Sequence, residues 1–229
     1  MKARRFGVAW AIAAASLCWT PPACAAAYER APIAQYRMDR AAEIALARSA
    51  APPVIAKDAT VLVLGAKGYE VAAPGTNGFT CVVERSWATT FDDPEYWNPR
   101  VRGPICFNAA ATRSVLPEYF KRTAWVLAGE DVAGIRAHVI AAVAAKEIAA
   151  PEVGAMCYMM AKGGYLSDKA GGHWHPHLMY FLPRTDAASW GANMDGSPVF
   201  AFVDAIEPIT IFFAPVPAWS DGTMGPMQM

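Results

Sequence analysis

The stretch that decides the fold consists of Thr60-Val-Leu-Val-Leu64, Tyr69-Glu-Val-Ala-Ala73 and Phe79-Thr-Cys-Val-Val-Glu84, with turn signals between them. The first two runs are rich in strand-forming residues and flank Gly65-Ala-Lys-Gly68, a pattern typical of a β-hairpin. The second turn, Pro74-Gly-Thr-Asn-Gly78, contains Gly and Asn, which tolerate positive φ. We therefore predict three consecutive strands that form an N-terminal β-meander.

Helical and extended patterns follow one another in blocks along the rest of the chain. A short helix is expected over 39–49, and two central helices over 114–127 and from Asp131 to Pro151, with an irregular segment over 86–110 before them. The order of helix, strands, helices and strands favours an α+β fold with a largely antiparallel sheet and the two central helices packed on it. Four later runs are predicted as strands: Ala155–Met160, His175–Leu182, Pro198–Val203 and Ile209–Ala214.

The composition excludes several classes of protein. The chain has 229 residues with 20 basic and 20 acidic side chains; 55% of the residues are hydrophobic and 17% are charged. Disorder requires low hydrophobicity and high charge, and a neutral balance argues against nucleic acid as the main partner. No linker divides the later part of the chain. We therefore expect a lead-in with a short helix over 26–58 and a single α+β domain over 59–229.

The first 25 residues have the pattern of a secretory signal peptide. A basic start (Lys2, Arg4 and Arg5) precedes the apolar run 6–19, and Ala23-Cys24-Ala25 supplies a cleavage site of small residues. The apolar run of 14 residues is too short to cross a bilayer as a helix, and no later run reaches 18. We therefore expect an exported protein, periplasmic or secreted, with no membrane span. A buried N-terminal helix and a lipid anchor at Cys24 are the alternatives.

Three cysteines remain beyond the signal region: Cys81, Cys106 and Cys157. An odd number in an oxidising compartment indicates one disulfide and one free thiol. A bridge between Cys81 and Cys106 would close the long polar loop between them. Cys157 lies in an apolar run, which favours a buried thiol over a nucleophile. No Cys-x-x-Cys spacing points to redox chemistry or structural zinc.

The segment with the most chemical information is Gly171–Leu182, which contains three of the four histidines. His173, His175 and His177 are spaced by two, so an extended strand would place them on one face, continued by Met179 and Phe181. Imidazole is a common ligand of zinc and copper, and three nitrogens with one open position form a catalytic zinc site. The sequence thus suggests a divalent transition metal, such as zinc or copper, held by these three histidines.

The spacing also limits this metal hypothesis. Alternate residues of a straight strand lie about 7 Å apart, so His173 and His177 would be separated by about 13 Å. They share one ion only if the strand bends or bulges; two histidines with a third ligand from elsewhere form an easier site. Histidines that only make structural hydrogen bonds remain the alternative to a metal site.

Several motifs carry a resemblance. The elements Gly75-Thr-Asn-Gly-Phe-Thr-Cys81, Cys106, Tyr158-Met159 and Pro176-His177-Leu-Met179 make residues 59–183 similar to a family of uncharacterised bacterial exported proteins. Some members keep Pro-His-x-Met without the neighbouring histidines, which singles out His177. The resemblance implies an exported single domain with Cys81 and Cys106 as a unit. It implies no established activity.

Two functions follow from these patterns. The first is a small exported binding or accessory domain, with a polar site around the three histidines and Asn77 that takes a small molecule or a metal ion. The second is a metal-dependent periplasmic enzyme, most simply a hydrolase that uses metal-bound water. The chain lacks the nucleophile elbow, phosphate loop, dinucleotide fingerprint and His-Glu-x-x-His motif, which removes the commonest motif-bearing enzyme classes.

Overall fold

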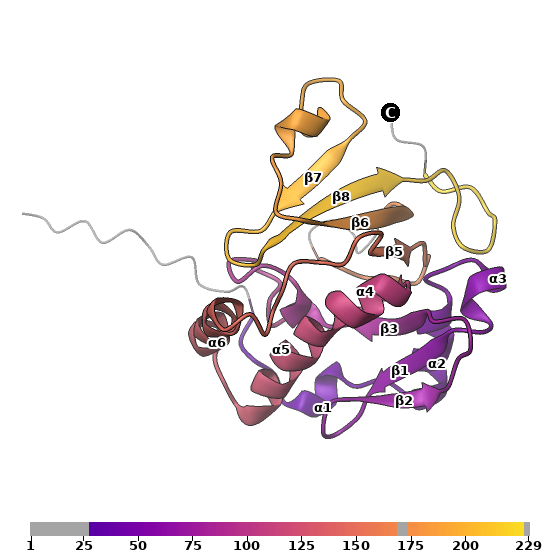
Figure 1. Ribbon diagram of the computed structural model, residues 1–229. Helices are drawn as coiled ribbons and strands as arrows, with labels where there is room; N and C mark the ends of the chain where they lie inside the picture. The colour runs from indigo at the N-terminus through magenta and orange to yellow at the C-terminus, as the bar shows by residue number, and fades with distance from the viewer. Residues whose placement is uncertain (1–27, 169–173, 227–229) are drawn as a thin grey trace, which may run out of the picture.

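An eight-stranded sheet organises residues 28–168 and 174–226, which the computed structural model describes (Figure 1). Its strand order is β2-β1-β3-β4-β5-β6-β8-β7, and every pair except β1 and β3 is antiparallel. The predicted α+β fold with a largely antiparallel sheet is therefore confirmed. The strands are β1 Thr60–Leu64, β2 Tyr69–Ala73, β3 Thr80–Glu84, β4 Gly103–Phe107, β5 Met156–Met159, β6 His177–Pro183, β7 Phe200–Val203 and β8 Ile209–Pro215.

Three predictions lie outside the described residues. These are the signal peptide over 1–25, the lipid anchor at Cys24 and the metal ligand His173. Among the residues that the structure does describe, no helix is both long and apolar enough to cross a membrane.

The helices begin where the sequence provides capping side chains. Asp39 accepts a hydrogen bond from the backbone nitrogen of Ala42 (2.9 Å), and Asp131 accepts one from Gly134 (2.7 Å). The helix predicted from Asp131 to Pro151 starts as expected but ends at Ala144. The helices are α1 Ile33–Tyr36, α2 Arg40–Arg48, α3 Pro53–Ala56, α4 Ala109–Ser114, α5 Leu116–Ala128 and α6 Val132–Ala144, with 3-10 turns η1 Ser86–Ala88 and η2 Ala188–Trp190.

Helices cover both faces of the first half of the sheet. Ala47 of α2 packs with Val61 and Val83 on one face, and Leu116 of α5 packs with Val82 and other residues on the opposite face. Side chains alternate along a strand, so one apolar strand supplies both cores. Of the two predicted central helices, α5 packs on the sheet, while α6 lies outside it against α5 (Figure 1).

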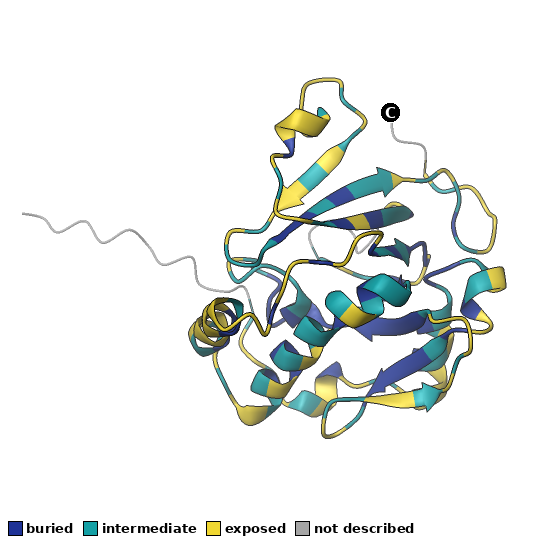
Figure 2. Cartoon of the chain, viewed as in Figure 1, coloured by how far each residue is buried: buried dark blue, intermediate teal, exposed yellow. Residues whose placement is uncertain are grey.

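The prediction of a β-meander is wrong in one respect. The first two strands form the expected hairpin, but β3 lies beside β1 and parallel to it, with Thr60 opposite Thr80. A meander would have placed β3 next to β2. The strand β2 instead forms the partly exposed edge of the sheet, while all five residues of β3 are buried (Figure 2). Burial of this apolar strand between two neighbours stabilises it more than an edge position would.

The turn after β2 carries the chain from one side of β1 to the other, where β3 pairs with it. The backbone nitrogen of Gly75 donates to Thr60 Oγ1 (3.1 Å), and that of Thr76 donates to the Asp58 carbonyl (2.8 Å). The turn thus crosses the start of β1. A Cβ atom at Gly75 would lie 2.1 Å from the Thr60 nitrogen, so this crossing requires glycine.

The predicted disulfide is present. Cys81 of β3 and Cys106 of β4 are directly opposite each other and are bonded, and both are fully buried. Between them runs the loop 85–102. Cys157 is a free, buried thiol, as expected from its apolar surroundings.

The second half of the sheet is covered less completely than the first. The residues of β7 are largely exposed, including Phe200 and Val203, and Tyr180 of β6 is exposed on the same half (Figure 2). The opposite face of β6 and β8 turns toward α5 and the loop 85–102. Between these elements the molecule is hollow.

Candidate functional site

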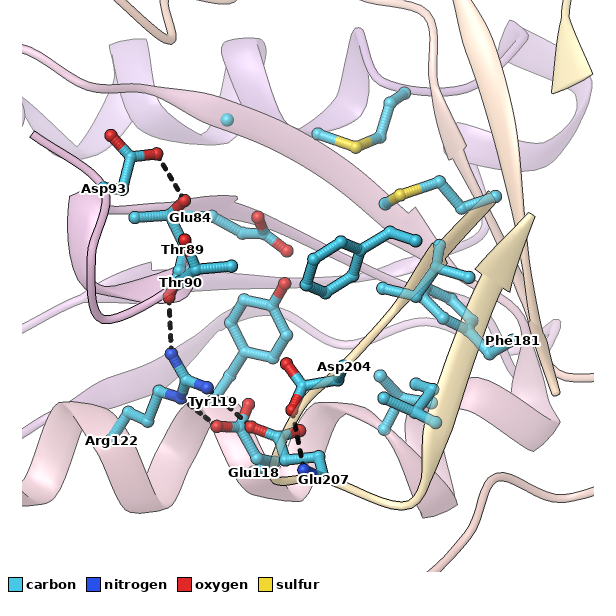
Figure 3. A pocket seen from close by; sticks show the side chains of 18 of the residues that line it. Glu84, Thr89, Thr90, Asp93, Glu118, Tyr119, Arg122, Phe181, Asp204 and Glu207 are labelled. Carbon is cyan, nitrogen blue, oxygen red and sulfur yellow. Dashed lines mark hydrogen bonds and ion pairs between the residues drawn. The ribbon is translucent and has the colours of Figure 1, made fainter. Parts of the chain in front are cut away.

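A cavity of about 400 Å³ lies between the sheet and α5 (Figure 3). This volume is within the range of small-molecule sites, roughly 300–1,000 Å³. Its wall includes the end of β3, the loop 85–102, α4 and α5, the strands β5, β6, β7 and β8, and the turn that precedes β8. Large apolar side chains line it, among them Met159, Met179, Phe181, Ile211 and Phe213.

The strand β6 builds one side of the cavity by simple alternation. His177, Met179 and Phe181 all line the cavity, which confirms the prediction that they share a face. The neighbouring β8 continues the wall, because Met179 is opposite Phe213 and Phe181 is opposite Ile211. Tyr180, between these residues, points to the other face and is exposed.

Glu84 is the most unusual group on the wall. It is the last residue of β3 and only 8% exposed, and its Oε1 atom has no hydrogen-bond partner among the described residues. Burial raises the pKa of its carboxyl group to about 8, although Tyr119 and Arg122 act to lower it. Most Glu84 side chains are therefore protonated at neutral pH, and the group can donate a hydrogen bond as well as accept one.

Two weak acids lie close to Glu84. The Tyr119 hydroxyl points toward the Glu84 carboxyl (Figure 3), and burial together with Glu84 raises the pKa of Tyr119 well above 10. Burial, and then Glu84, likewise raises the pKa of Cys157 well above its ordinary value. Both groups therefore stay neutral, and the Cys157 thiol is a poor nucleophile.

A charged cluster lines the α5 side of the cavity. Arg122 forms ion pairs with Glu118, one helical turn earlier, and with Glu207 (Nη2 to Oε1, 2.5 Å) (Figure 3). Its Nη1 donates to the carbonyl oxygens of Thr89 (2.7 Å) and Trp87 (3.2 Å). We call Glu118, Arg122 and Glu207 the Arg122 cluster. It ties α5 to the loop 85–102 and to the turn before β8.

The cluster is buried, and this changes its titration. Burial acts to lower the pKa of Arg122, but Glu118 and Glu207 outweigh it and raise the pKa. Burial raises the pKa of Glu207 to about 8, and competition from Glu118 for the same guanidinium adds to the shift. Arg122 thus stays charged, while Glu207 exchanges its proton near neutral pH.

His177 has a defined tautomer. Its Nδ1 lies 2.7 Å from the carbonyl oxygen of His175, and since a carbonyl can only accept, Nδ1 carries the proton. Burial lowers the pKa of His177, so its ring is neutral at pH 7 and Nε2 presents a lone pair. Trp174 and Phe213 flank the ring at centroid distances of 6.0 and 5.7 Å.

The histidines are placed differently from one another. His177 lines the cavity at the start of β6, whereas His175 precedes the strand and is exposed. Within 28–168 and 174–226, no three His, Cys, Asp or Glu side chains are grouped so that they could hold a metal ion. Because His173 lies outside those ranges, a zinc or copper ion bound by His173, His175 and His177 stays a prediction.

Asn77 and His177 are not brought together. Asn77 lies in the turn before β3, and β4 and β5 separate that strand from β6. Its side chain donates to the Ile55 carbonyl (2.8 Å) and accepts from the Phe79 nitrogen (3.1 Å). Both polar atoms therefore stabilise the turn.

Sequence reasoning missed the polar groups of the cavity. Glu84 carried one usable signal, since an acidic residue ends a strand that is otherwise apolar. Tyr119 and Arg122 carried none, because only the tertiary fold brings them to Glu84.

Comparisons with known proteins identify no relative of this chain. No protein-family model matches the chain, and neither a curated protein nor a solved structure matches it.

Proposed function

We propose that the protein is an exported binding protein that holds one small, largely apolar molecule in the cavity between α5 and the sheet. One observation carries this proposal: Glu84 is buried on the cavity wall, and its Oε1 lacks a hydrogen-bond partner. Buried polar atoms in folded proteins almost always have partners, so an exception needs an explanation. A bound molecule would supply the missing partner.

The composition of the wall supports the proposal. Apolar side chains dominate, and a few polar groups are concentrated at defined places: Glu84 and Tyr119 beside β3, and His177 at the start of β6. Small-molecule sites generally combine an apolar lining that supplies affinity with a few polar groups that fix orientation.

The cavity is also held open by the fold itself. The Arg122 cluster joins three separate wall elements, and the disulfide closes the loop that carries Thr89 and Asp93. A site that is formed before binding loses less conformational entropy when a ligand enters.

Export remains part of the proposal. The signal-peptide pattern of residues 1–25 supports it, and so does the disulfide, since such bridges persist mainly in oxidising compartments. The ligand would then be a molecule met outside the cytoplasm.

Methyl NMR tests the binding site directly. Protein with ¹³C-methyl methionine is titrated with 2-phenylethanol, a small apolar probe. We expect the Met159 and Met179 methyl signals, which come from the cavity wall, to shift in a saturable way. The exposed Met194 and Met224 are internal controls and should not shift. Unchanged Met159 and Met179 signals at millimolar probe, or equal shifts of all four, would refute the cavity as a binding site.

A further inference from the structure

The cavity wall is strongly acidic. Of its two guanidinium groups, that of Arg85 is committed elsewhere, because its Nη2 pairs with Glu43 at 2.7 Å on the α2 side of the sheet. The other, that of Arg122, is shared by two carboxylates of its own cluster. Six carboxylic side chains of the described residues line the cavity: Glu84, Asp93, Glu95, Glu118, Asp204 and Glu207.

Two of these acids have neutral hydrogen-bond donors and no ion pair among the described residues. Asp93 accepts from the Thr89 hydroxyl (2.6 Å), and Glu95 accepts from the Asn98 amide (2.6 Å). Neither hydrogen bond brings a positive charge to the cavity wall. The field inside the cavity therefore opposes an anionic ligand and favours a cation.

Glu84 is the place where a cation would be held. The titratable groups that interact with it are Tyr119 and Arg122 from α5, Cys157 from β5 and Tyr69 from β2, and burial keeps Tyr69 neutral. Tyr119 and Cys157 are neutral, and Arg122 is bound to its own carboxylates. Tyr119 and Arg122 favour the ionised form of Glu84 only in part, because burial outweighs them, and Oε1 has no hydrogen-bond partner among the described residues.

We infer that the ligand is an organic ammonium ion with an apolar body, whose nitrogen pairs with Glu84 while its body lies against Met179 and Phe181. The inference rests on the proposed binding function and names the chemical class of the ligand. A neutral hydrogen-bond acceptor would satisfy a protonated Glu84, but it would bring no positive charge to balance the excess of acidic side chains on the wall.

Pairing with an ammonium ion requires Glu84 to ionise. The ammonium keeps its proton, the Glu84 carboxyl gives up its own, and that proton passes to the solvent. Affinity for the amine should thus rise about tenfold per pH unit below pH 8, where the free protein still holds the proton. A neutral ligand would show no such rise.

The test uses three probes of similar size: 2-phenylethylamine, 2-phenylethanol and 3-phenylpropanoate. Binding to the full chain is followed by calorimetry from pH 6 to 8, in two buffers of different ionisation enthalpy, and by the Met159 and Met179 methyl signals. We expect the amine to bind about tenfold more tightly than the alcohol at pH 8, because a charge-assisted hydrogen bond is stronger than one between neutral groups. The propanoate should bind most weakly.

Glu84→Gln should abolish both the preference for the amine and its pH dependence, while binding of the alcohol persists. Glu70→Gln, an exposed acid on the edge strand β2, is the control and should change neither. Equal affinity of the amine and the alcohol in the wild type would overturn the inference but leave the binding function intact. If no probe shifts Met159 or Met179, the binding function itself fails.

Discussion

Glu84 and Arg85 are neighbours in sequence, but their side chains lie on opposite faces of the sheet. The two buried side chains also differ in whether their polar atoms have hydrogen-bond partners. Arg85 donates through Nε to the Tyr36 carbonyl (2.6 Å), through Nη2 to Glu43 (2.7 Å), and through Nη1 to the Val83 carbonyl. All its nitrogens are occupied. On the other face, Glu84 has an oxygen with no partner.

The difference separates a structural charge from a functional one. Burial of a charge is costly unless ion pairs and hydrogen bonds compensate it. The pair of Arg85 and Glu43 meets this condition, since Glu43 Oε1 also accepts from the Leu64 nitrogen (3.0 Å). Glu84 avoids the cost by keeping its proton, and the uncompensated group faces a cavity. Four predictions test this contrast.

The largest effect is expected at the compensated pair. Glu43→Ala leaves the Arg85 guanidinium buried with a lost partner, and we expect a loss of about 3–5 kcal/mol in the free energy of unfolding. Urea denaturation measures it. The double variant Glu43→Ala with Arg85→Met removes the orphaned charge and should recover part of the loss. A loss below about 1 kcal/mol for Glu43→Ala would show that the pair is not the structural element described here.

The disulfide should have the second largest effect. Cys81 and Cys106 are 25 residues apart, and closure of a loop of that size contributes about 3.5 kcal/mol in the chain-entropy model. Cys81→Ala with Cys106→Ala should therefore lower the free energy of unfolding by about this amount. Because the loop also forms part of the cavity wall, the Met159 and Met179 methyl signals should broaden, while that of Met194 should not. Unchanged stability in the double variant would contradict the entropic role.

The third prediction concerns the pH dependence of stability. The folded state raises the pKa of Glu84 to about 8, so between pH 4.5 and 8 the folded protein binds more protons than the unfolded chain. The free energy of unfolding should therefore decrease with rising pH, by about 2 kcal/mol between pH 6 and 7.5 from this group. Glu84→Gln should remove that contribution. Part of the decrease should persist, because the pKa of Glu207 is raised in the same direction.

Glu43 provides a reference for a purely structural carboxylate. Glu43→Gln, on the other face, breaks a buried ion pair and should lower the free energy of unfolding. If Glu84→Gln also lowers the free energy of unfolding and leaves its pH dependence unchanged, Glu84 is a second structural group and not part of a binding site.

Most of the fold was readable from the sequence, because its strands are continuous apolar runs. The strand β4 was missed: it begins Gly103-Pro104, and proline, which lacks an N–H donor, is unfavourable inside a sheet. Pairing with β3 on one side and β5 on the other overrides this preference. The order of the strands was predicted less well, since the crossing at Gly75 depends on a hydrogen bond from its backbone nitrogen to Thr60 Oγ1 that has no sequence pattern.

The candidate site was predictable only on the β6 side. Alternation placed His177, Met179 and Phe181 on one face, and the structure confirms that face as a wall of the cavity. Glu84 and Tyr119 are 35 positions apart in the sequence and come from a strand and a helix on different layers. No spacing in the sequence predicts that these two side chains lie close together. The polar half of the site is therefore visible only in the tertiary structure.

The smallest effect is expected at His177, where it distinguishes a hydrogen-bonding histidine from a metal ligand. His177→Gln loses the donation from Nδ1 to the His175 carbonyl, which should lower the free energy of unfolding by about 1 kcal/mol. This loss should be equal with a chelator and with added zinc, because the bond needs no metal. His175→Gln is the matched control; its exposed ring should contribute little. If zinc stabilises the wild type and either substitution abolishes that gain, the histidines hold a metal. The sheet would then carry, besides the paired Arg85 and the unpaired Glu84, histidines whose ring nitrogens have a partner only when a metal ion is bound.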